Sequence, residues 1–194
     1  MSTGKIKYLV LSIASVCLLT ACSKNLIKEG TEQLEQGDYE KAVTAFEQAA
    51  EDAEKEGDRA PEAYRGIGMA CYAQEDYEGT RQNLQKALDE GGLETPVIYN
   101  LIGVSSMKLE DYDGALAAFS KGIELPESGI VSRGTKQETE ADYSEVIREM
   151  KFNRVVCFEK KLDWENAKAA MAEYASQYPD DAEAQKEAEF LSTR

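Results

Sequence analysis

The chain repeats one five-residue pattern four times: DYEKA at Asp38–Ala42, DYEGT at Asp76–Thr80, DYDGA at Asp111–Ala115 and DWENA at Asp163–Ala167. Each copy has an aspartate first, an aromatic residue second and a small residue fifth. Aspartate is favoured immediately before a helix, where its carboxylate accepts hydrogen bonds from the first backbone amides. Each copy therefore predicts the start of a helix.

Other residues recur at similar distances from this pattern. A bulky residue follows each copy, at Phe46, Leu84, Phe119 and Met171. A small residue follows three of these positions, at Ala49, Ala87 and Gly122. An aromatic, an aliphatic residue and a glycine precede the two middle copies, as Tyr64, Ile67 and Gly68 and as Tyr99, Ile102 and Gly103. Because small residues let helices approach and large ones fill the gap, this spacing describes packing and carries no chemistry.

Taken together, these positions resemble the tetratricopeptide repeat (TPR), a helix-turn-helix unit of about 34 residues. The resemblance implies an all-α, right-handed solenoid of about four repeats, followed by a C-terminal capping helix. The repeats are expected at approximately residues 23–56, 61–94, 96–129 and 148–181, and the capping helix at 180–193.

One spacing departs from the repeat. Ala115 and Ala167 are 52 positions apart, which leaves room for an insertion over residues 127–147. Gly129 and Gly134 predict a loop in its first part. The apolar residues from Tyr143 onward have helical spacing, and we expect one long helix from about Glu138 to Lys160.

The N-terminus has the features of an export signal. Residues 1–21 contain Lys5 and Lys7 and then an apolar run without acidic residues, the order found in secretory signals. The run ends in Leu19-Thr20-Ala21-Cys22, which resembles the lipobox of bacterial lipoproteins. The alternatives are a signal without lipid or an uncleaved membrane helix, although about 15 apolar positions are fewer than the ~20 that span a bilayer.

The lipobox resemblance implies a tethered protein. Residues 1–21 would be cleaved, Cys22 would carry acyl chains such as palmitate, and residues 22–194 would form a single TPR-like domain. The expected location is the extracytoplasmic face of the cell membrane. If the host has two membranes, Ser23 after the cysteine favours the outer one.

The charge of the chain limits its partners. The formal net charge is −15, and cleavage of a segment with two lysines and no acids changes it to −17. Such a surface repels nucleic acid and anionic headgroups, so we expect no nucleic-acid partner. It also explains why a lipid would be needed to hold the protein at a membrane.

The sequence offers little for catalysis. It contains no histidine, which excludes the common histidine-dependent nucleophile systems, and no phosphate-binding glycine loop. Asp111-Tyr112-Asp113-Gly114 resembles the opening of a calcium loop but lacks the remaining ligands. Cys71 and Cys157 are interpreted as small buried residues without a disulfide. We therefore expect no enzyme, no cofactor, no metal and no small-molecule substrate.

The family resemblance also implies where a partner would bind. TPR arrays line their concave face with side chains of the first helix of each unit. The corresponding positions in the two middle repeats include Arg65, Met69, Tyr72, Asn100, Val104, Met107 and Lys108. In the fourth repeat these positions are Glu149, Phe152, Val156 and Glu159. Methionine and tyrosine suit adaptable binding of a peptide or a partner helix.

Two questions stay open at the level of sequence. In one alternative the inserted segment 127–147 folds over this groove, and the apolar stripe of Met69, Tyr72, Val104 and Met107 belongs to the core. The favoured function is a protein- or peptide-binding interaction module. The alternatives are a structural or assembly factor of a cell-envelope complex and an accessory of a separate enzyme.

Overall fold

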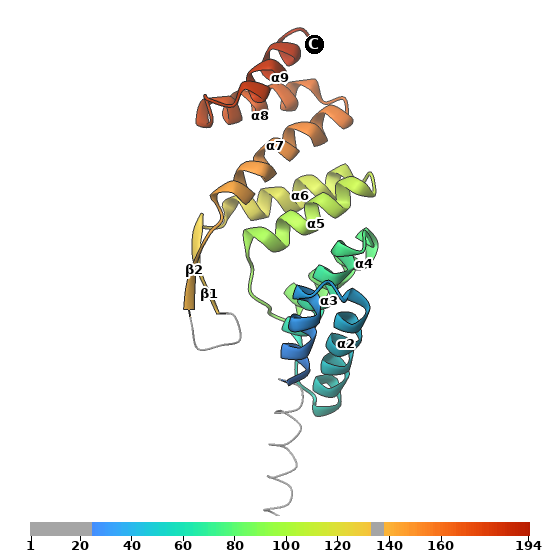
Figure 1. The fold of residues 1–194 in the computed structure, drawn as a ribbon. Coiled ribbons are helices and arrows are strands. Elements are labelled where there is room, and N and C mark those ends of the chain that lie inside the picture. The colour runs from blue at the N-terminus through green and yellow to red at the C-terminus, as the bar shows by residue number, and fades with distance from the viewer. Residues whose placement is uncertain (1–24, 133–137) are drawn as a thin grey trace, which may run out of the picture. The chain divides into compact units, whose positions relative to one another are not determined.

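The structure is a computed structural model that describes residues 25–132 and 138–194 (Figure 1). The predicted signal peptide and Cys22 lie outside these residues. The chain divides into two compact units, the first ending at Leu93 and the second beginning at Glu94. The expectation of a single domain from Cys22 onward stays a prediction.

The first unit is built from antiparallel helix hairpins. Its elements are a helix over residues 25–35, α2 (Tyr39–Glu56), α3 (Pro61–Ala73) and α4 (Tyr77–Asp89). Gly57 ends α2 with a φ of 75°, in the left-handed region that glycine enters without steric penalty. Helix α3 packs against both α2 and α4.

The second unit continues the pattern with one interruption. Its elements are α5 (Pro96–Lys108), α6 (Tyr112–Glu124), β1 (Ser128–Ser132), β2 (Glu138–Asp142), α7 (Ser144–Lys160), α8 (Trp164–Gln177) and α9 (Ala182–Ser192). Helices α5 and α6 form one hairpin, α7 and α8 form the next, and α9 packs on α8. The predicted all-α fold with a C-terminal capping helix is confirmed.

The prediction of one helix from Glu138 to Lys160 is wrong at its start. Strands β1 and β2 pair in an antiparallel hairpin, and α7 begins only at Ser144. The Tyr143 amide closes the hairpin on the Glu127 carbonyl at 2.7 Å, and Asp142 Oδ1 accepts the Ser144 amide at 2.9 Å. The Asp142 carboxylate thus accepts the first amide of α7, whose N-cap residue is Tyr143. The loop expected around Gly129 is likewise a strand.

The four copies of the sequence pattern each begin a helix, as predicted. Helices α2, α4, α6 and α8 follow Asp38, Asp76, Asp111 and Asp163. The Asp76 and Asp111 carboxylates accept hydrogen bonds from the amides of Gly79 and Gly114, both at 2.9 Å. Asp38 makes no such cap and pairs with Lys41 at 2.7 Å.

The residue before each of these aspartates adopts the left-handed backbone conformation. The φ values are 80° at Gly37, 61° at Glu75, 61° at Glu110 and 59° at Leu162. Only the first is a glycine, and the other three carry side chains in a region that L-residues rarely enter. The same tight turn therefore forms in all four hairpins because the packed helices on either side require it.

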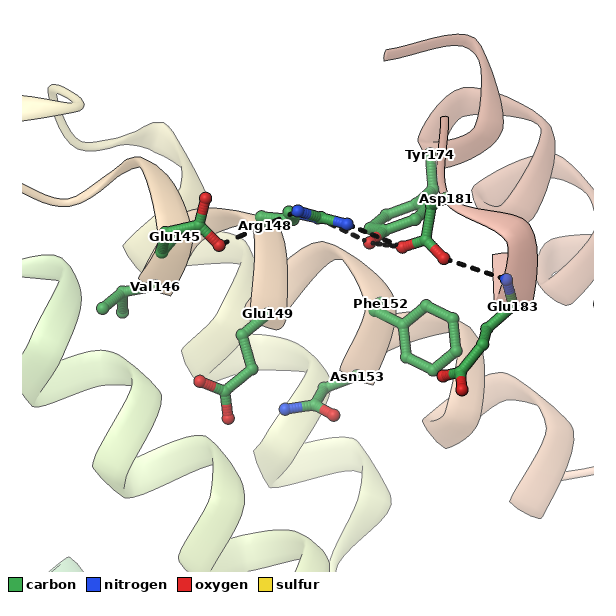
Figure 2. Close-up of a pocket in the computed structure, with 9 residues that line it drawn as sticks. All are labelled: Glu145, Val146, Arg148, Glu149, Phe152, Asn153, Tyr174, Asp181 and Glu183. Carbon is green, nitrogen blue, oxygen red and sulfur yellow. Dashed lines mark hydrogen bonds and ion pairs between the residues drawn. The ribbon is translucent and has the colours of Figure 1, made fainter. Parts of the chain in front are cut away.

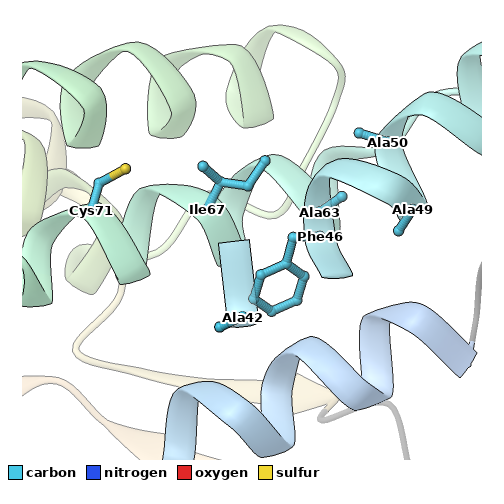
Figure 3. Packing of buried hydrophobic residues seen from close by; sticks show 7 residues of the cluster. All are labelled: Ala42, Phe46, Ala49, Ala50, Ala63, Ile67 and Cys71. Atoms are coloured by element: carbon cyan, nitrogen blue, oxygen red, sulfur yellow. The ribbon is translucent and has the colours of Figure 1, made fainter. Parts of the chain in front are cut away.

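The core of the first unit surrounds one aromatic ring. Phe46 on α2 lies among alanines of α2 and α3 and beside Ile67 (Figure 3). A Cβ atom added at Gly30 would lie 2.7 Å from this ring, and one at Gly66 would lie 2.5 Å from it. Two helices therefore approach α2 closely because both present glycine to Phe46.

One packing pair recurs through both units at a fixed separation of 16 residues. Gly30 faces Phe46, Gly68 faces Leu84 and Gly103 faces Phe119. In the last hairpin the corresponding residues are Val155 and Met171, both buried in one core cluster. The sequence pattern is thus realised as a contact between a glycine of each first helix and a bulky residue of the second, except in the fourth hairpin.

Candidate partner-binding surfaces

The predicted groove residues of the first unit lie on successive turns of α3. Met69 is 38% exposed, which is high for a large apolar side chain. Arg65 and Tyr72, one turn to either side, are half-buried. The Tyr72 ring meets that of Tyr77 edge to face at 6.2 Å. This face therefore presents an apolar side chain between a cation and a positioned aromatic ring.

The predicted groove residues of the second unit are used differently. Val104 and Met107 on α5 are half-buried and pack against the core that α6 and α7 complete. Asn100 donates from Nδ2 to Glu149 Oε2 on α7 at 3.2 Å, and Lys108 is exposed. Much of the apolar surface of α5 therefore supports α7.

These observations bear on the alternative in which the stripe belongs to the core. The core against which Val104 and Met107 pack contains Tyr143 and Ile147, from the end of the inserted segment. In the second unit the stripe is therefore partly structural. Three of the seven predicted residues belong to the first unit and four to the second. That all seven line one groove stays a prediction.

A pocket lies in the second unit where α7 faces the start of α9 (Figure 2). Its volume is about 410 Å³. It is lined by Glu145, Val146, Arg148, Glu149, Phe152, Asn153, Tyr174, Asp181 and Glu183. Glu149 and Phe152 occupy the concave-face positions that the resemblance implies for the fourth repeat. The pocket thus adds a second candidate surface, which the choice of groove residues in the two middle repeats missed.

A hydrogen-bonded network forms one wall of this pocket. Arg148 donates from Nε to Tyr174 Oη at 3.0 Å and from Nη2 to Asp181 Oδ2 at 2.8 Å. Tyr174 Oη also donates to Asp181 Oδ2 at 2.8 Å. Asp181 Oδ1 accepts the amides of Glu183 and Ala184, both at 3.1 Å, and so caps α9.

The network fixes the charges of its members. Hydrogen bonds from Arg148, from the Ala184 amide and from Tyr174 hold the pKa of Asp181 well below its ordinary range. Hydrogen bonds to Tyr174 and Asp181 raise the pKa of Arg148, so its guanidinium stays charged. The Arg148 guanidinium also lies over the Tyr178 ring, 5.1 Å from its centroid. The network therefore joins α7, α8 and the start of α9.

Sequence reasoning could not identify this network in advance. Tyr174 and Asp181 are 26 and 33 positions from Arg148, and no local motif connects them. The one local signal is Asp181 itself, which precedes a helix. Its second role, as partner of Arg148, depends on how the last three helices pack.

The two described cysteines are free and buried, as expected for packing residues. Burial raises the pKa of each thiol to about 11, so both are poor nucleophiles near neutral pH. The described side chains form no group of three or more histidine, cysteine or acidic residues that could hold a metal ion. Within residues 25–132 and 138–194, no helix is long and apolar enough to cross a bilayer.

Comparison with known proteins identifies the family. Three family models described as tetratricopeptide repeat match residues 27–93, 96–128 and 151–181, which together make up more than half of the chain. The protein belongs to the TPR family, and the fold predicted from the repeated pattern is confirmed. No curated protein matches it by sequence.

Several solved structures share the fold at low sequence identity. YrrB, described as a TPR protein with an unusual peptide-binding site, is 21% identical with a TM-score of 0.67; the match covers 87% of this chain and 75% of that one. A MamA structure is 12% identical with a TM-score of 0.68, over 88% and 80% of the two chains. PilF of Pseudomonas aeruginosa is 13% identical with a TM-score of 0.59, over 89% and 68%.

Proposed function

We propose that this protein is a membrane-tethered, extracytoplasmic and non-enzymatic module that holds a protein or peptide partner. TPR helix hairpins are interaction scaffolds whose first helices offer side chains to a partner. The observation that carries the proposal is the α3 face, where Met69 is 38% exposed between Arg65 and Tyr72. A flexible thioether beside an aromatic ring adapts to varied apolar side chains.

Two further observations support the proposal. YrrB shares the fold and is described as having a peptide-binding site, which makes peptide binding a reasonable function for this scaffold. The lipobox-like Leu19-Thr20-Ala21-Cys22 supports acylation at Cys22 and therefore a lipid tether. At least two acyl chains are needed for stable attachment, because one chain binds a membrane only marginally.

Site-specific photocrosslinking in the native membrane tests the function. A photoreactive residue replaces Met69, and a second variant carries the same residue at Leu109, which is similarly exposed at 40% but lies in the turn after α5. We expect one partner to crosslink from position 69 and not from position 109. The same products from both positions would show nonspecific contact. A fixed, large complex that copurifies quantitatively would instead favour the structural or assembly role.

A further inference from the structure

The pocket in the second unit contains one cation that is already held by the protein. Arg148 contacts Asp181 at 2.8 Å, and its Nη1 lies 3.8 Å from Glu145 Oε2. Its side chain is about one-third exposed. Because its strong hydrogen bonds go to Tyr174 and Asp181, the guanidinium forms a wall and does not offer a free charge to an anionic ligand.

The remaining charge in the pocket is negative. Four carboxylates line it, and only Asp181 is matched by the close contact with Arg148. The Glu145 side chain is 85% exposed, and Glu149 and Glu183 are exposed as well. Glu149 accepts one hydrogen bond, from the Asn100 amide at 3.2 Å, which orients it. The pocket therefore attracts a positive group and repels an anion.

The pocket also has an apolar side, which distinguishes it from a solvated group of acids. Phe152 is half-buried and meets Tyr174 edge to face at 5.4 Å, so its ring is held in place. Val146 lies two turns earlier on α7 and is also half-buried. Figure 2 shows the Phe152 ring on α7 and Glu183 at the start of α9 lining the same opening.

We infer that this pocket binds a lysine or arginine side chain from a peptide segment of the partner. Such a side chain has an apolar stem, which suits Phe152 and Val146, and a charged end, which suits the glutamates. A cation over an aromatic ring gains further stabilisation. The volume of about 410 Å³ lies within the ~300–1,000 Å³ of ligand pockets, so it accommodates the side chain with some flanking backbone.

The inference rests on the proposed function, since the ligand is part of a protein partner. It assigns that partner a chemical character that the exposed Met69 face does not specify. The formal charge of the chain, −15, favours a basic segment in the same sense and speeds its association.

Three fluorescein-labelled peptides test the inference by fluorescence anisotropy on the full chain in neutral detergent micelles at low salt. One has the sequence Gly-Lys-Gly-Lys-Gly, and the other two carry norleucine or glutamate in place of lysine. Norleucine keeps the apolar stem and removes the charge. We expect the lysine peptide to bind at least about tenfold more tightly than the norleucine peptide, and the glutamate peptide not to bind.

Variants separate the pocket from general electrostatic attraction. The pair Glu149→Gln and Glu183→Gln should weaken lysine-peptide binding at least about tenfold, and Phe152→Leu should weaken it several-fold. The matched pair Glu124→Gln and Glu189→Gln removes the same charge from exposed sites outside the pocket lining and should change binding less than twofold. Circular dichroism spectra should be equal for all variants.

Two results would overturn the inference. Equal binding of the lysine and norleucine peptides would show that charge is not recognised, and equal losses in the two glutamine pairs would show that the attraction is general. If either occurs while position 69 still crosslinks a specific partner, the proposed function stands without this pocket. If the lysine peptide binds selectively to the pocket and position 69 crosslinks nothing, the proposed role of the α3 face in partner binding is wrong.

Discussion

The ring of Phe119 on α6 lies directly against the backbone of Gly103 on α5, so closely that a Cβ atom at Gly103 would overlap it. Both residues are fully buried or nearly so. Substitution of Gly103 by alanine should therefore overpack the contact and destabilise the protein by about 1–3 kcal/mol. This loss should exceed the ~1 kcal/mol that alanine gains in a helix interior. Urea unfolding midpoints measure the difference.

The last hairpin suggests the compensating change. It has Val155 and Met171 where the others have glycine and a stiffer bulky residue. Because methionine is flexible, Phe119→Met should relieve part of the overlap, and the double variant should lose less stability than the two single changes together. Glu51→Gln, on an exposed face of α2, should lie within about 0.5 kcal/mol of the wild type. Strict additivity of the stability losses of Gly103→Ala and Phe119→Met would show that the two residues do not compete for space.

The two roles of Asp181 can be separated by substitution. Asn keeps a side-chain oxygen that caps α9 but loses the charge that binds Arg148, whereas Ala loses both. The urea midpoint should therefore fall from wild type to Asp181→Asn and again to Asp181→Ala. Because the pKa of Asp181 is lowered by folding, its stabilising effect should be present at neutral pH and be lost in strong acid. The Asn variant should show less of this acid-dependent loss; equal acid profiles would contradict the assignment.

A glutamate at the contact between α7 and α9 should make stability depend on pH. Burial and a hydrogen bond with the Glu187 side chain raise the pKa of Glu159 to about 7. A raised pKa means that the folded state retains a proton that the unfolded chain has released. The stabilisation is complete below the ordinary glutamate pKa and declines as pH rises through about 7.

Substitution of Glu159 by glutamine, which stays neutral, should remove this dependence. Wild type should lose stability between pH 5 and pH 8 relative to Glu159→Gln, as followed by urea midpoints at both values. Glu165→Gln, on the exposed first turn of α8, provides a control with the same chemical change. Parallel behaviour of wild type and Glu159→Gln would show that the carboxyl group is ionised throughout.

The proposed lipid tether depends on the thiol of Cys22. Cys22→Ser should abolish acylation, because serine lacks the sulfur to which the first acyl group is attached. Metabolic labelling with a radioactive or clickable fatty acid should mark the wild type alone, and the variant should stay unprocessed or leave the membrane fraction. The buried Cys157→Ser, which keeps Cys22, should remain labelled. Label on the Cys22 variant would remove the lipoprotein assignment.

Much of the fold was predictable because the information is local and repeated. The same hairpin is specified four times. In each copy an aspartate precedes the second helix, and a bulky residue follows that aspartate at a fixed distance. The strands β1 and β2 were not predictable in this way, because Glu138–Asp142 is short and acidic and carries no clear period. Its pairing with Ser128–Ser132 forms only through contacts across the hairpin.

The candidate surfaces show a similar limit. The position of Met69 in the repeat indicated its exposed face, but the same rule placed Val104 and Met107 on a face that α7 partly covers. The position of a residue within the repeat identifies the helix face that points away from the other helix of the same hairpin. It does not say how far the next helix extends across that face, and this is decided by packing between repeats.

We propose that the α3 face captures a partner at the membrane, and Met69→Gln tests this proposal at a single exposed side chain. Glutamine has a similar length and removes the apolar character, and Leu109→Gln makes the same kind of change at a comparable exposure outside the predicted groove. Capture of the partner by a general chemical crosslinker in native membranes should fall about fivefold or more for Met69→Gln and stay unchanged for Leu109→Gln. Both urea midpoints should match the wild type. Equal capture by all three proteins would show that the α3 face does not hold the partner.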